Sequence, residues 1–119
     1  MKSHLKPPEI KLLPLRFPSS WEISYNTLVE LDPSDLKEDD ENKWRNFTED
    51  LLQVKHTKYN ILLDVGWYPE GDPQGLYGIE LIKDFDWANP LVTFDTKNIS
   101  DLVEKIEFLL WQVGEGYYN

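Results

Sequence analysis

Residues 59–82, YNILLDVGWYPEGDPQGLYGIELI, contain two apolar stretches separated by a run rich in proline and glycine. Large apolar side chains fill every second position of the first stretch, Tyr59, Ile61, Leu63, Val65 and Trp67. Successive side chains of a β-strand point to opposite faces, so this period of two is typical of a strand. Residues 69–75 favour a turn, and the second strand follows from Leu76 to Ile82. The stretch therefore predicts a β-hairpin with a long connecting tip.

Two further strands are predicted on either side of this hairpin. From Trp21 to Leu31, apolar or β-branched residues again alternate with polar ones, and Leu28 is the one large apolar residue on the polar face. Asp32-Pro33 ends this strand, because proline cannot donate a backbone hydrogen bond to a neighbour. Leu91 to Phe94 predicts a short strand after Asn89-Pro90.

The end of the chain carries the clearest helix pattern. From Ile99 to Val113 the apolar residues recur at spacings of three and four, which places them on one side of a helix. Asn98 can cap its first turn, and Gly114 suits the position just after its end. A second, shorter helix is predicted around residues 43–53, where Trp44, Phe47 and Leu51 show the same spacing, with a polar turn at 55–58.

These elements predict an α+β domain. We expect a mainly antiparallel sheet of about four strands, with the C-terminal helix packed on one face and a second short helix. A chain of 119 residues fits one core, so residues 1–119 are predicted to form a single domain. Its core spans residues 21–113, and residues 1–20 are a proline-rich lead-in that we expect to cover a sheet edge or a flank of the core.

The charge of the chain limits its partners. Twelve basic and 22 acidic residues give a net charge of −10; the first 20 residues carry +3, so the remainder carries −13. Such a body repels nucleic acid and anionic membranes, so neither is an expected partner. The chain has no cysteine for a disulfide, no apolar run of 18 residues and no secretory signal pattern, so we expect a cytoplasmic protein.

The usual catalytic patterns are missing from the sequence. The two histidines, His4 and His56, have no second ligand at metal-binding spacing, and no glycine-rich phosphate loop or Gly-x-Ser-x-Gly turn occurs. We therefore expect no catalytic residue, no cofactor and no metal site. Asp84-Phe85-Asp86 is the one motif-like string. Its two carboxylates leave three interpretations open: a solvated turn, a pair presented to a protein partner, or a divalent-metal site.

Acidic residues next to aromatic ones predict a protein-binding surface. Residues 30–50 hold nine acidic and three basic residues, and residues 64–86 hold six acidic residues and only Lys83 as a base. Tryptophan and tyrosine within a charged rim are typical of binding hot spots. Trp21, Trp67 and Trp111 are expected to pack in the core, whereas Trp44 and Trp87 suit either core or interface. The residues predicted to contact a partner are Asp39, Asp40, Glu41, Trp44, Tyr68, Glu70, Asp72, Tyr77, Asp84, Asp86 and Trp87.

Four short strings carry a resemblance to a known class of proteins. Residues 21–26 (WEISYN), 46–52 (NFTEDLL), 63–68 (LDVGWY) and 82–91 (IKDFDWANPL) resemble small immunity proteins of bacterial contact-dependent growth inhibition, or polymorphic toxin, systems. The likeness covers about residues 21–113. It implies a cytoplasmic protein that binds and neutralises the C-terminal toxin domain of a cognate system, commonly a nuclease. The family shares no catalytic residue, so the resemblance assigns no site residue.

Three hypotheses of function follow. In the first, the chain is an immunity protein that binds a basic nuclease toxin as a monomer in a 1:1 complex, occluding its substrate cleft with an acidic, aromatic-containing surface. In the second, it is an acidic nucleic-acid mimic or adaptor that binds a housekeeping basic protein. The third is a small enzyme that uses Asp84 and Asp86 with a divalent metal.

Overall fold

A five-stranded antiparallel sheet and one long helix make up most of the structure, a computed structural model that describes residues 10–119. The chain is therefore α+β, as predicted, with one strand more than the four expected. Its elements are β1 (Trp21–Asn26), the 3₁₀ helix η2 (Pro33–Asp35), α1 (Glu41–Trp44), β2 (Leu52–His56), β3 (Ile61–Tyr68), β4 (Leu76–Lys83), β5 (Val92–Thr96) and α2 (Ile99–Gly114).

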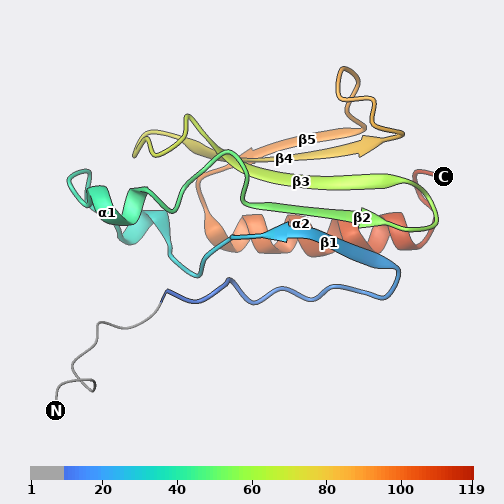
Figure 1. Cartoon of the computed structure of the whole chain (residues 1–119), viewed down its shortest axis with the longest axis horizontal. Coiled ribbons are helices and arrows are strands. Elements are labelled where there is room, and N and C mark those ends of the chain that lie inside the picture. The colour runs from blue at the N-terminus through green and yellow to red at the C-terminus, as the bar shows by residue number, and fades with distance from the viewer. Residues whose placement is uncertain (1–9) are drawn as a thin grey trace, which may run out of the picture.

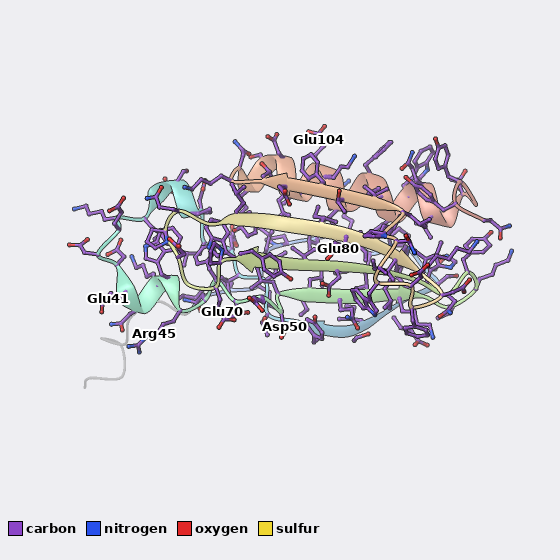
Figure 2. The ribbon with its side chains drawn as sticks, turned by 90° about the horizontal axis from the view of Figure 1, so that it is seen from above. Glu41, Arg45, Asp50, Glu70, Glu80 and Glu104 are labelled. Carbon is purple, nitrogen blue, oxygen red and sulfur yellow. The ribbon has the colours of Figure 1, made fainter. Side chains whose placement is uncertain are left out.

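The strands lie in the order in which they occur in the chain, β1-β2-β3-β4-β5, and each pairs antiparallel with the next. Helix α2 runs along one face of this sheet (Figure 1). No helix of the described residues covers the opposite face, as the two views of Figures 1 and 2 agree. The sheet thus has a covered face and an open face.

The core lies between the covered face and α2. The predicted alternation of β3 is confirmed, because Ile61, Leu63, Val65 and Trp67 are all buried there. The predicted C-terminal helix is also confirmed, and the Asn98 side chain accepts a hydrogen bond from the Asp101 amide at 2.9 Å. The helix contributes a stripe of buried apolar residues, Leu102, Ile106, Leu109, Leu110 and Val113. Among the described residues no helix is long and apolar enough to cross a membrane.

The end of α2 differs slightly from the prediction. Gly114 is the last helical residue, and Gly116, with a φ of 80°, takes the left-handed position that glycine favours. The Gly116 amide donates to the Val113 carbonyl at 2.9 Å, and the Tyr117 amide donates to the Gln112 carbonyl at 3.1 Å. These two bonds form a Schellman motif, which satisfies the last carbonyls of the helix.

The helix predicted for residues 43–53 is wrong over most of its length. Helix α1 ends at Trp44, and Leu52 begins a strand that was not predicted from the sequence. In β2 the buried residues Leu52, Val54 and His56 alternate with half-buried ones. The strand pairs with both β1 and β3, so neighbours on two sides satisfy its backbone. Phe47 and Leu51 are spaced as in a helix, but both reach the core from a loop.

The long strand predicted for residues 21–31 ends at Asn26. Its pairing with β2 is irregular between Ile23 and Tyr25, and an irregularity of this kind moves the following side chains to the other face. Consequently Leu28, predicted to face outward, is only 1% exposed. Ile23, predicted to be in the core, precedes the irregularity and pairs with the buried Val54, but it lies on the edge strand β1 and is 51% exposed.

Residues 10–20 cover a flank of the core, as predicted for the lead-in. The Leu13 amide donates to the Leu28 carbonyl at 2.8 Å, and the Glu30 amide donates to the Lys11 carbonyl at 2.7 Å. Leu13 is buried, and Leu15 and Phe17 pack against the core. Residues 1–9 of the lead-in lie outside the described residues.

Candidate protein-binding face

Carboxylates from three adjacent strands meet on the open face of the sheet. Because Leu63 and Val65 of β3 point into the core, Asp64 between them points to the open face. Asp64 pairs with Glu80 of β4, and Asp95 of β5 pairs with Gly78. Two tyrosines and the loop before β2 add to this group. We call the surface the acidic sheet face; it consists of Tyr25, Glu49, Asp50, Asp64, Tyr68, Glu80 and Asp95.

Asp64 and Glu80 form a like-charge pair. They lie directly opposite each other on antiparallel strands, where two negative side chains destabilise the sheet. A cavity of about 390 Å³ opens beside them and is bounded by Tyr68, Thr93 and Asp95. Figure 2 shows Glu80, Asp50 and Glu70 along the sheet, away from Glu104 on α2. The open face therefore holds closely spaced negative charge in a shallow hollow.

Hydrogen bonds fix the Asp64 carboxylate in place. Its Oδ1 lies 3.1 Å from the Tyr25 hydroxyl and accepts a bond of 3.3 Å from the Gln53 amide. The same hydroxyl lies 3.4 Å from Asp50 and can donate its single proton to either acid. Burial raises the pKa of Asp64, the Asp50 charge raises it further, and the two hydrogen bonds only partly offset this. Within residues 10–119, no lysine or arginine is among the groups that shift this pKa.

Tyr68 lies across two glycines that make room for its ring. A side chain at Gly66 would come within 2.8 Å of the ring and would also clash with the Glu49 carbonyl, and one at Gly78 would lie 3.4 Å from the ring. The Tyr68 hydroxyl donates to the Glu49 carbonyl at 3.3 Å. Burial and, secondarily, the charges of Asp64, Glu49 and Glu80 raise the pKa of Tyr68, so it remains a hydrogen-bond donor at neutral pH.

The hairpin tip extends the acidic sheet face at one end. Glu70 accepts a hydrogen bond from the Glu49 amide at 3.0 Å, and the Gly71 amide donates to the Phe47 carbonyl at 2.7 Å. These bonds hold the tip against the loop before β2. Of the residues predicted from the sequence, Tyr68 belongs to the face, and Glu70 lies at its edge.

The remaining predicted acids fall into two groups at opposite ends of the sheet (Figure 1). Asp39, Asp40 and Glu41 surround the start of α1, near the tip that carries Asp72; the two segments are joined by a 2.8 Å bond from the Gln74 amide to Glu38. The loop between β4 and β5, with Asp84, Asp86 and Trp87, lies at the other end. Strands of eight residues separate the groups by roughly 25 Å.

The prediction that Trp44 and Tyr77 contact a partner is wrong. They are 4% and 1% exposed, so neither can contact a partner. Both surround the buried Trp67, with ring centroids 5.8 Å and 4.9 Å from its own, and the Trp44 indole donates to the Lys37 carbonyl at 2.8 Å. Tyr77 faces the core because it pairs with Trp67 across the hairpin.

The other tryptophans are divided between the core and the surface. Trp67 is buried and Trp21 packs against the core at partial exposure, as predicted. Trp111, predicted to pack, is 56% exposed, because it lies outside the apolar stripe of α2. Trp87, for which both interpretations were open, is exposed.

The Asp84-Phe85-Asp86 string forms a turn. Asp84 and Phe85 have left-handed φ values of 53° and 59°. The Asn60 amide donates to Asp84 at 3.2 Å, and the Asn89 amide donates to Asp86 at 3.1 Å. Within residues 10–119, no group of three or more His, Asp or Glu side chains is arranged to hold a metal ion.

Sequence reasoning missed most of the acidic sheet face. Asp64 and Glu80 occupy polar positions of predicted strands, and a hairpin centred on Asp72 aligns them, as it aligns Gly66 with Gly78. The pairing of Asp64 with Glu80 could therefore have been predicted from the sequence. Asp50 and Asp95 carried no comparable signal, because their place depends on the unpredicted β2 and on the pairing of β5.

No protein-family model, curated protein or solved structure matches this chain.

Proposed function

We propose that this chain is an inhibitor of the immunity type, which binds a positively charged toxin domain and covers the cleft where that toxin binds its substrate. The acidic sheet face is the binding surface. The observation that carries the proposal is the placement of Asp64 and Glu80 directly opposite each other, beside Asp95, on three paired strands.

The energetics of this arrangement favour a basic partner. A like-charge pair across two strands costs roughly 0.2–1 kcal/mol in the free chain. A lysine or arginine placed between Asp64 and Glu80 replaces this repulsion with two attractions. Binding therefore recovers a cost that the unbound chain carries, and the negative field accelerates association with a positive partner, toward about 10⁸–10⁹ M⁻¹s⁻¹ at low salt.

Rigidity and aromatic content also suit an interface. The carboxylates of Asp64, Glu80 and Asp95 project from paired strands, so little backbone entropy is lost when a partner binds them, and hydrogen bonds already hold the Asp64 side chain. Tyr68 is exposed among them, with its ring held over Gly66 and Gly78. Tyrosine supplies a large contact area together with a hydrogen-bonding group, a combination that is enriched in binding hot spots. A nuclease cleft lined with basic residues offers the complementary surface.

The test is neutralisation of a toxin. The protein encoded next to this gene is expressed in bacteria with and without the chain, and growth is recorded. We expect the neighbour to end in a small basic domain that arrests growth, and co-expression to restore growth. If no neighbouring protein is toxic, or if toxicity persists with the chain present, the proposed function is wrong.

A matched pair of variants tests the surface itself. Asp64→Asn/Glu80→Gln removes two charges from the acidic sheet face, and Asp39→Asn/Glu41→Gln removes two from the α1 end. Calorimetry of the purified complex at rising salt should show 1:1 binding that weakens with salt. The first variant should weaken it at least about tenfold more than the second, since 1.4 kcal/mol is a factor of ten. Equal losses from the two variants would refute the assignment of this face.

The negative groups at both ends of the sheet also favour a second function, that of a nucleic-acid mimic binding a housekeeping basic protein. A panel of unrelated basic proteins separates the two functions. The mimic binds several of them with similar affinity, whereas the immunity protein binds one partner far more tightly than the rest.

A further inference from the structure

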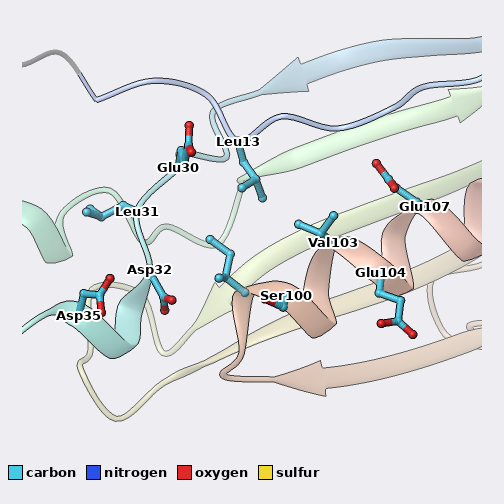
Figure 3. Close-up of a pocket in the computed structure, with 10 residues that line it drawn as sticks. Leu13, Glu30, Leu31, Asp32, Asp35, Ser100, Val103, Glu104 and Glu107 are labelled. Atoms are coloured by element: carbon cyan, nitrogen blue, oxygen red, sulfur yellow. The ribbon is translucent and has the colours of Figure 1, made fainter.

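A groove separates the first half of α2 from the segment that follows β1. Its floor is apolar and is formed by Leu13, Leu31, Ile99 and Val103. The groove has a volume of about 720 Å³, which falls in the range of ligand-binding clefts. Figure 3 shows Leu13 and Val103 turned toward the space between α2 and the N-terminal segment.

Carboxylates line both walls of the groove. Glu30, Asp32 and Asp35 come from one wall, and Glu104 and Glu107 come from α2 (Figure 3). Two of the five already have partners in the chain. Asp32 accepts bonds of 2.9 Å and 2.8 Å from the Ser34 amide and hydroxyl, and Glu107 accepts a 2.9 Å bond from the Arg16 amide.

The other three carboxylates define the charge that the groove presents. Glu30, Asp35 and Glu104 are exposed and come from both sides of the apolar floor, and Figure 3 shows the carboxylates of Glu30 and Glu104 turned outward at the rim. An occupant must therefore be apolar along its length and positive at its ends. Lysine and arginine have this form, because a chain of methylene groups carries the charged group.

From this complementarity we infer that the groove binds an extended segment of a protein partner that carries lysine or arginine side chains. Their stems lie on Leu31, Ile99 and Val103, and their charged groups reach Glu30 and Glu104. The inference deepens the proposed function, on which it rests for the basic character of the partner.

The position of the groove determines what kind of segment it accepts. It lies on the α2 side of the sheet, whereas the acidic sheet face lies on the opposite side. A rigid domain docked on the acidic sheet face cannot reach across the molecule. The groove therefore takes a flexible segment of the partner, and two linked contacts raise the overall affinity by effective concentration.

The experiment uses the full chain and a fluorescein-labelled, end-capped nine-residue peptide with lysine at every third position and alanine and leucine elsewhere. Fluorescence anisotropy measures its binding. Glu30→Gln/Glu104→Gln removes two charges from the groove rim, and Glu22→Gln/Asp39→Asn removes two exposed charges elsewhere. We expect the rim variant to weaken binding at least fivefold more than the control. Asp64→Asn/Glu80→Gln, which removes two charges from the opposite side of the sheet, should weaken peptide binding no more than the control does.

Several results would overturn the inference. Equal weakening by the rim variant and its control would mean that the peptide responds only to net charge. Stronger peptide binding after deletion of residues 1–9 would assign the groove to the basic start of this chain. Competition by spermine at the peptide's own concentration would make it a polyamine site, and loss of binding when the chain dimerises would make it an interface between copies.

The two proposals can fail separately. If the chain neutralises a toxin and the rim variant does so equally well, the groove inference is wrong and the proposed function stands. If neutralisation fails while the rim variant still loses the peptide, the groove binds basic segments of some other protein, and only the proposed function is wrong.

Discussion

Replacing Asp64 with asparagine should stabilise the folded chain at neutral pH. The asparagine side chain keeps an oxygen where the Tyr25 hydroxyl and the Gln53 amide donate, at 3.1 Å and 3.3 Å in the native chain. The substitution removes the cost of holding a half-buried charge and the repulsion from Asp50, and it leaves an uncharged side chain directly opposite Glu80. Relief of a like-charge cross-strand pair contributes roughly 0.2–1 kcal/mol. We expect a total gain of about 1 kcal/mol at pH 7, or roughly 3–6 °C in Tm for a domain of this size.

The gain should depend on pH in a defined direction. The pKa of Asp64 is raised in the folded chain, so the folded state binds this proton more tightly than the unfolded state, whose carboxyl has a pKa near 3.9. The native chain therefore loses stability as pH rises from about 4 through the folded pKa. Asp64→Asn avoids that loss. The two proteins should be equally stable below about pH 3.5 and should differ by a constant amount once Asp64 is ionised.

Urea unfolding followed by tryptophan fluorescence, at pH values from 3 to 8, measures the difference. Asp39→Asn is the matched control, because it removes the same charge from an exposed position outside the sheet. It should change the free energy of unfolding by less than about 0.5 kcal/mol. If Asp64→Asn is less stable than the native chain at pH 7, the carboxylate is a net stabilising group, and the argument for a cost borne in the free chain is wrong.

Substitutions at three other positions test the fold. His56 is buried, and its Nδ1 accepts hydrogen bonds from the Lys58 and Tyr59 amides at 3.3 Å and 3.4 Å. Burial and then the Lys58 charge lower its pKa, so the native chain should lose stability as pH falls below about 6.5. His56→Gln should remove this pH dependence of the unfolding free energy in urea unfolding between pH 5 and 7. Gly66→Ala should lower Tm by several degrees, because the new methyl group meets the Glu49 carbonyl and the Tyr68 ring; an unchanged Tm would refute this contact. Asn98→Ala should reduce the free energy of unfolding by about 1 kcal/mol, whereas Asn98→Asp should retain the cap.

The predictable parts of this fold are those in which pattern and burial coincide. The stripe from Ile99 to Val113 and the alternation from Ile61 to Trp67 were readable because one side of each element is fully apolar. Residues 44–54 misled because Trp44, Phe47 and Leu51 reach the core from a short helix and a loop at spacings that imitate a longer helix. Residues 52–54 form a strand because they pair with β1 and β3, and such pairing depends on residues far away in the sequence.

The candidate site was less predictable than the fold. Tyr68 and Glu70 were identified from composition, and the structure places them on or beside the acidic sheet face. Tyr77 was misassigned because the phase of β4 follows from its pairing with Trp67, not from its own sequence. Asp64 and Glu80 required knowledge that α2 covers only one side of the sheet, which depends on the tertiary packing of the chain.

Alternation along β3, β4 and β5 also separates two kinds of evolutionary change. Inward positions such as Leu63, Val65 and Ile79 maintain the core, whereas Asp64, Glu80, Thr93 and Asp95 between them contribute no side chain to it. These four outward residues can therefore be exchanged one at a time at little cost to folding, as surface substitutions generally are. Under the proposed function, a lineage can retain one scaffold and diversify what it recognises, so descendants with similar backbones would neutralise different toxins.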